Sequence, residues 1–91
     1  MVVLGSEGKS LYDVMLEHPN RLASKSYIEL AYMEVDKELR LAELKLGYAL
    51  ENERKRLDSS KTTWRFMTRS NIYNCVQALI GTIKTKCSDV V

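Results

Sequence analysis

The chain has 91 residues, of which 45% are hydrophobic and 29% charged, and its formal net charge is +2. This length suffices for one domain with a small core, and the composition excludes a disordered chain. Four glycines and one proline leave few turns, which favours a few long helices over many short strands.

A short N-terminal helix is predicted over residues 10–18, after a flexible lead-in over residues 1–9. We expect Ser10 to cap this helix, with Asp13 at its third position. The helix should end at His18, because a proline at position 19 disfavours helical geometry in the residue before it.

A long central helix is predicted over residues 26–57. It begins with a capping box, Ser26 to Glu29, and is rich in strong helix formers. Gly47 is its only breaker and costs about 1 kcal/mol relative to alanine. The only break expected before the next helix lies at residues 58–60, which either turn the chain into a hairpin or continue the same helix.

The central helix has apolar residues on two opposite faces. One face follows a heptad pattern and predicts a buried seam of Ile28, Tyr32, Val35, Leu39, Ala42, Leu46 and Ala49. The opposite face contains Leu30, Met33, Leu41, Leu44 and Tyr48. Charged residues fill the wedges between, with Asp36, Arg40, Glu43 and Arg54 in one of them. A helix with one apolar face needs one neighbour, whereas this helix needs two.

A C-terminal helix is predicted over residues 60–87, with an apolar stripe formed by Ile72, Val76, Leu79, Ile83 and Cys87. The sequence therefore predicts a single all-α domain: a short N-terminal helix, a long central helix and a C-terminal helix in a helical hairpin or coiled-coil-like bundle.

The residues do not suggest catalysis or a bound cofactor. The chain has one histidine and no phosphate-binding glycine loop. Cys75 and Cys87 are twelve residues apart with no neighbouring histidine, so we expect no metal site and reduced thiols. No secretory signal or membrane-spanning run is apparent, which predicts a cytoplasmic protein that does not enter membranes.

A basic and aromatic patch is the strongest site-like feature. Lys61, Arg65 and Arg69 would form one row on a continuous helix, and Arg54, Lys55 and Arg56 precede them. Trp64 and Phe66 are interleaved, a combination typical of an interface hot spot or of a base-stacking site. The alternative is that Trp64, Phe66 and Met67 belong to the core, with the cations solvated around them.

The segment ELAYMEVDKELRLAEL, residues 29–44, resembles small helical proteins encoded in the early regions of tailed bacteriophages. Those proteins are mostly uncharacterised, so no functional residues carry over. The resemblance implies expression in a bacterial cytoplasm, as an accessory of DNA metabolism or an inhibitor of a host protein.

The sequence thus predicts a non-enzymatic interaction protein, homodimeric or bound to a protein target. Its predicted partner-binding residues are Leu30, Met33, Leu41, Leu44, Tyr48 and Trp64. The alternative is a nucleic-acid-binding accessory that uses the basic patch around residues 54–69.

Overall fold

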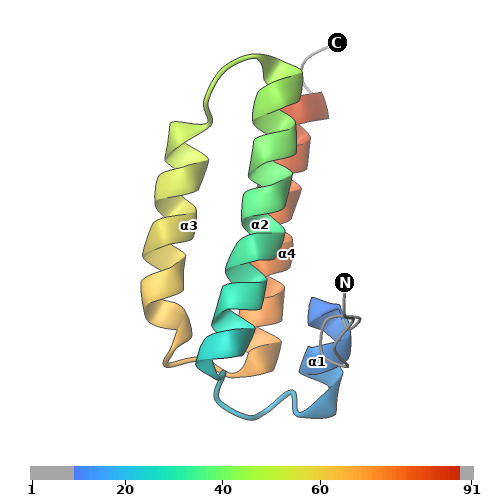
Figure 1. The fold of residues 1–91 in the computed structure, drawn as a ribbon, viewed down its shortest axis with the longest axis vertical. Coiled ribbons are helices and arrows are strands. Elements are labelled where there is room, and N and C mark those ends of the chain that lie inside the picture. Colours follow the sequence, from blue (N-terminus) through green and yellow to red (C-terminus); the bar gives the residue numbers. More distant parts are fainter. Residues whose placement is uncertain (1–9, 89–91) are drawn as a thin grey trace, which may run out of the picture.

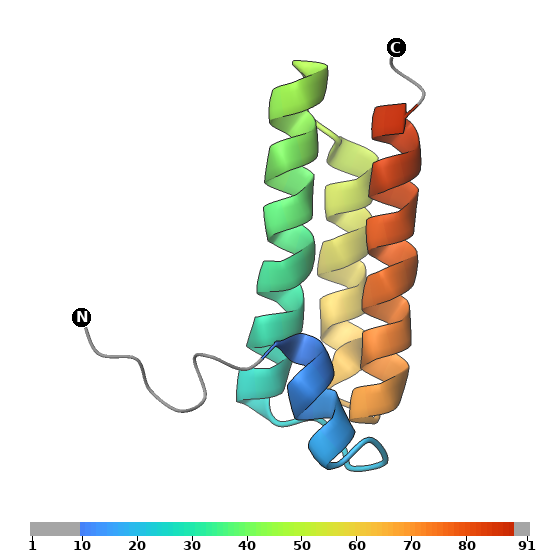
Figure 2. The ribbon, with the colours of Figure 1, turned by 90° about the vertical axis from the view of Figure 1, so that its right-hand side faces the viewer.

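The computed structural model describes residues 10–88, which form four helices: α1 (Leu11–Glu17), α2 (Lys25–Leu46), α3 (Glu51–Trp64) and α4 (Arg69–Ser88). Helices α2, α3 and α4 form an antiparallel three-helix bundle, and α1 lies beside one end of α2 and α4, on the side away from α3 (Figures 1 and 2). The predicted all-α class is confirmed. The predicted lead-in, residues 1–9, lies outside the described residues.

Helix α1 begins as the sequence predicts. The Ser10 side chain accepts a hydrogen bond from the Asp13 N–H at 3.1 Å, and the Asp13 carboxylate accepts one from the Ser10 N–H at 3.3 Å. These reciprocal bonds satisfy two backbone donors that a helix start otherwise leaves free. The helix ends at Glu17, next to His18 and Pro19.

The N-cap of α2 lies two residues earlier than predicted. Ser24 is the N-cap, and its hydroxyl accepts a hydrogen bond from the Tyr27 N–H at 3.3 Å. The predicted Ser26–Glu29 capping box is therefore wrong, because Ser26 already lies in the first helical turn. Its hydroxyl lies 3.1 Å from that of Ser24.

The predicted continuous helix over residues 26–57 is wrong, because the chain turns at Gly47. Gly47 has a φ of 85°, in the left-handed region, and its N–H donates to the Glu43 carbonyl at 2.8 Å. Left-handed geometry costs a residue with a Cβ about 1–2 kcal/mol, so glycine is the residue that ends a helix in this way. The chain reverses over the next residues, and α3 returns along α2 (Figure 1).

Of the two alternatives for residues 58–60, the continuous helix is correct, so the predicted helix start at residue 60 is wrong. Asp58, Ser59 and Ser60 lie inside α3, and the turn comes instead at residues 65–68. Thr68 then caps α4, since its hydroxyl accepts a hydrogen bond from the Asn71 N–H at 3.2 Å. Without glycine or proline, serine and aspartate favour a helix start but do not force one.

The core lies where the three long helices meet. The α2 seam is largely confirmed, since Ile28, Val35, Leu39 and Ala42 are buried. Tyr32 and Leu46 are half-buried at its edge, whereas Ala49 is exposed in the turn. From α3 and α4, Leu57, Trp64, Ile72, Val76, Leu79 and Ile83 complete the core. The predicted stripe of α4 is therefore buried, apart from Cys87, which is half-buried.

Two connectors are joined at the end of the bundle that holds α1. The segment before α2 pairs with the segment before α4: Ala23 N–H donates to the Met67 carbonyl at 3.1 Å, and Arg69 N–H donates to the Arg21 carbonyl at 3.0 Å. The buried Tyr27 hydroxyl donates to the Arg69 carbonyl at 3.2 Å, and burial raises the pKa of Tyr27 to about 12. This phenol therefore stays neutral and hydrogen-bonded at physiological pH.

The two glycines of the described chain should respond in opposite ways to alanine. Gly47→Ala places a Cβ on a left-handed residue and should lower the free energy of unfolding by about 1–2 kcal/mol. Gly81→Ala lies within α4, where an added Cβ meets nothing within 4 Å, and should raise it by about 0.5–1 kcal/mol. Urea titrations of the two variants test this, and equal effects would contradict the assigned turn.

Candidate functional site

The second apolar face of α2 points away from the bundle. Met33, Leu41, Leu44 and Tyr48 have exposed fractions of 62%, 56%, 81% and 59%. Leu30 is half-buried and packs against the edge of the core. These residues follow one another at intervals of three or four residues, except between Met33 and Leu41, where Lys37 takes the intervening position. Tyr48 does not lie on the helical face as predicted, because α2 ends at Leu46 and Tyr48 follows the turn at Gly47. We call Leu30, Met33, Lys37, Leu41, Leu44 and Tyr48 the α2 stripe.

The surface around the α2 stripe is hollowed in two places that open to solvent. One hollow, of about 490 Å³, is bordered by Met33, Lys37 and Leu41. The other, of about 570 Å³, is bordered by Leu44, Tyr48 and the Gly47 turn. Side chains from a second helix could interdigitate in such hollows, as knobs do in the holes of a coiled coil.

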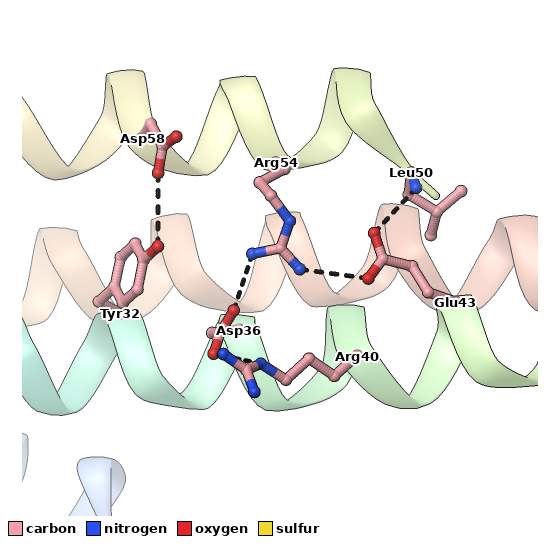
Figure 3. Close-up of polar contacts among 7 residues, drawn as sticks. All are labelled: Tyr32, Asp36, Arg40, Glu43, Leu50, Arg54 and Asp58. Atoms are coloured by element: carbon pink, nitrogen blue, oxygen red, sulfur yellow. Dashed lines mark hydrogen bonds and ion pairs between the residues drawn. The ribbon is translucent and has the colours of Figure 1, made fainter. Parts of the chain in front are cut away.

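One flank of the α2 stripe is held by an ion-pair network between α2 and α3 (Figure 3). Arg54 of α3 donates to Asp36 at 2.8 Å and to Glu43 at 3.3 Å, both on α2. Arg40 pairs with Asp36 at 2.9 Å, and the second Glu43 oxygen accepts the Leu50 N–H at 2.9 Å. The network thus closes the turn at Gly47 and joins the start of α3 to α2.

The network also shifts the pKa values of Asp36 and Arg54. The hydrogen bond from Arg54 lowers the pKa of Asp36 below its ordinary value of 3.8, although partial burial opposes this. The hydrogen bond to Asp36 in turn raises the pKa of Arg54. The sequence places Asp36, Arg40, Glu43 and Arg54 in one wedge of a single helix. Their pairing across two helices was missed, because it depends on the reversal of the chain at Gly47.

Trp64 belongs to the core, so its predicted role in partner binding is wrong. Its exposed fraction is 0%, and its indole N–H lies 3.4 Å from the Cys75 sulfur. The predicted grouping of Trp64, Phe66 and Met67 in the core holds only in part, because Phe66 is 75% exposed and Met67 is half-buried. A buried tryptophan at the end of α3 serves packing and cannot meet a partner.

The predicted basic row does not form. Arg69 is in α4, beyond the turn at residues 65–68, so it does not continue the helical face of Lys61 and Arg65. Arg69 donates to the Val14 carbonyl at 3.2 Å and lies over the Tyr27 ring, 5.7 Å from its centroid. Its Nε atom is buried and has no hydrogen-bond partner.

The other predicted cations divide into paired and exposed ones. Arg54 is held in the network, and Lys61 pairs with Glu29 at 3.2 Å. Lys55, Arg56 and Arg65 are exposed. Half of the six cations are thus engaged in contacts within the chain, which reduces the charge free to meet phosphates.

Within residues 10–88, no group of three or more histidine, cysteine or acidic side chains is placed to hold a metal ion. No helix of the same residues is both long enough and apolar enough to cross a membrane. Comparisons of the chain with family models, with curated proteins and with solved structures found no match.

We expect the coupling between Asp36 and Arg54 to depend on pH. Because the folded-state pKa of Asp36 is lowered, its contribution is present above the unfolded-state value near 3.8 and is lost as the pH falls through the folded-state pKa. A double-mutant cycle of Asp36→Asn and Arg54→Met should give a coupling energy on the order of 1 kcal/mol at pH 7. The coupling should weaken as the pH is lowered below 3.8, and a coupling that does not change with pH would contradict the proposed pairing.

Trp64 and the neighbouring Phe66 provide a test of which aromatic ring is in the core. Trp64→Ala should lower the free energy of unfolding by about 3–5 kcal/mol, because it empties a fully buried volume. Phe66→Ala should change it by no more than about 0.5 kcal/mol. Urea titration followed by circular dichroism measures both, and a larger loss for Phe66→Ala would reverse the assignment.

Proposed function

We propose that the protein is a non-enzymatic helical interaction module that docks onto another protein chain through the α2 stripe. The observation that supports this is the exposure of four large apolar or aromatic side chains on one side of the molecule: Met33, Leu41 and Leu44 on one face of α2, and Tyr48 in the turn that follows it. Scattered exposed apolar residues are ordinary on a protein surface, but a contiguous row at helical spacing is typical of a helix that packs on a partner.

The size of the α2 stripe indicates a modest affinity. Burying each of its four exposed apolar side chains contributes roughly 1–2 kcal/mol, since each is already partly covered. The total, roughly 4–8 kcal/mol, is comparable with the cost of association, which is about 4–15 kcal/mol. Flanking polar contacts and the partner's own apolar surface must therefore contribute the rest, and we expect a weak complex.

We further propose a cytoplasmic location. Cys75 and Cys87 are free and half-buried, as is common for thiols in a reducing compartment. The resemblance of residues 29–44 to small phage proteins also supports a bacterial cytoplasm. It suggests that the partner, if it is not a second copy, is a host protein or a component of DNA metabolism.

The proposal is tested with a stripe variant, Leu41→Glu together with Leu44→Glu, and with Leu22→Glu as the matched control. Leu22 is 61% exposed but lies outside the α2 stripe, in the connector before α2. Light scattering of the purified protein and capture from a bacterial lysate should find the wild type in a complex, either with itself or with another protein. The stripe variant should lose that complex while its circular dichroism is unchanged, and the control should keep it.

Two results would contradict the proposal. One is a wild-type protein that forms no complex in either measurement. The other is a complex that the stripe variant retains in full, because the contact would then lie elsewhere on the molecule.

A further inference from the structure

We infer that the α2 stripe is covered by the α2 stripe of a second copy of this chain, with the two α2 helices antiparallel. The inference rests on the proposed function, because it assigns an occupant to the same surface. The spacing of the apolar residues along α2 and the charges on either side of them support it.

The α2 stripe is nearly symmetric about its own midpoint. A two-fold interface requires that residue i meets residue j of the partner while j meets i. Around a midpoint at residue 39, Met33 lies opposite the partner's Leu44 and Lys37 opposite the partner's Leu41, while Leu30 lies opposite the end of the partner's α2. One register thus brings the exposed apolar residues of α2 onto the partner's stripe.

The charges along one flank of the α2 stripe are complementary in this register. At 3.6 residues per turn, Glu34 and Lys45 lie about 60° and 80° to the same side of Lys37. In an antiparallel helix pair, residues on the same flank of the two helices face each other. The register set by the apolar residues then places Glu34 beside the partner's Lys45 and, by symmetry, Lys45 beside the partner's Glu34.

Both side chains are available for this contact. Lys45 is exposed and makes no ion pair with any of residues 10–88. The only ion pair of Glu34 within this range is a long contact of 3.9 Å with Lys37, which also lies in the stripe. An interchain pair could therefore form without breaking a strong contact within the chain.

The opposite flank does not counter this arrangement. Asp36 would approach the partner's Glu43, and Arg40 would approach the partner's Arg40, but each of them is already paired within its own chain, the two acids with Arg54 and Arg40 with Asp36. With Arg40, which is paired to Asp36, the cluster has two acidic and two basic groups and a formal charge of zero. Its repulsion across the interface is accordingly small.

The parallel alternative is disfavoured by the same charges. It would stack Lys37 directly on the partner's Lys37 in the middle of the apolar row. It would also bring Glu29 towards the partner's Glu34, because facing flank positions of parallel helices are five residues apart. Like charges in both places oppose a parallel pair, and the antiparallel pair avoids both contacts.

The inference is tested first by sedimentation equilibrium from 1 to 200 μM. The wild type should dimerise, and Lys45→Glu should weaken the dimer about tenfold or more, since two attractive pairs become repulsive. The double change Glu34→Lys with Lys45→Glu should restore the wild-type constant to within about threefold. Lys84→Glu, an equivalent charge reversal on the exposed side of α4, should have no effect.

The orientation is tested by placing a spin label at position 26, an exposed residue in the first turn of α2. Ser26→Cys is made in a background of Cys75→Ser and Cys87→Ala, in which serine keeps an acceptor for the Trp64 N–H. At a rise of 1.5 Å per residue, positions 26 of an antiparallel dimer centred on residue 39 lie roughly 40 Å apart. In a parallel dimer they would lie within about 15 Å.

Each result decides the inference. A dimer with charge-reversal rescue and the longer label distance supports it. A dimer without rescue, or with the shorter distance, overturns the antiparallel register. A monomer at 200 μM overturns the second copy as occupant. If the protein is a monomer but captures another protein, and the capture is lost in the Leu41→Glu, Leu44→Glu variant, the proposed function still holds. If it captures no protein, both the inference and the proposed function are contradicted.

Discussion

The structure depends on the left-handed turn at Gly47. Because Gly47 ends α2 with a φ of 85°, α3 turns back along α2 and does not extend it. The acidic and basic residues of α2 and α3 then face one another, and Arg54 joins Asp36 and Glu43 at the start of α3. The same reversal directs Leu57 and Trp64 into the core beside the α2 seam. Without it, these residues would lie far along one extended helix.

The reversal also decides how much of α2 the chain can cover by itself. Helices α3 and α4 pack on the seam of α2, and α1 covers only one end of α2 and α4 (Figure 2). A helix is a cylinder, so neighbours on one side leave the opposite side open. The α2 stripe is on that open side, and its apolar residues stay in contact with water in the single chain. The exposure of this face is the reason why we propose an interaction module.

The same packing accounts for the loss of the basic patch as a continuous feature. Trp64 is needed to fill the end of the core, and the turn that follows it moves Arg69 onto α4. There Arg69 contacts α1 through the Val14 carbonyl and α2 through the ring of Tyr27. A cation that organises the junction of three helices is not free to bind phosphate. Half of the basic patch therefore serves the fold, whereas Lys55, Arg56 and Arg65 stay exposed.

The sequence by itself determined the helical class, the α1 cap at Ser10, the seam of α2 and the stripe of α4, because these follow from local hydrogen bonding and from apolar spacing within one helix. It also predicted a second apolar face on the central helix, of which Met33, Leu41 and Leu44 are exposed. Only the tertiary structure decided that Gly47 ends a helix, that residues 58–60 continue one, and that Trp64 is buried. A glycine inside a helical pattern costs about 1 kcal/mol, and packing contributions of several kcal/mol between distant residues outweigh so small a local preference.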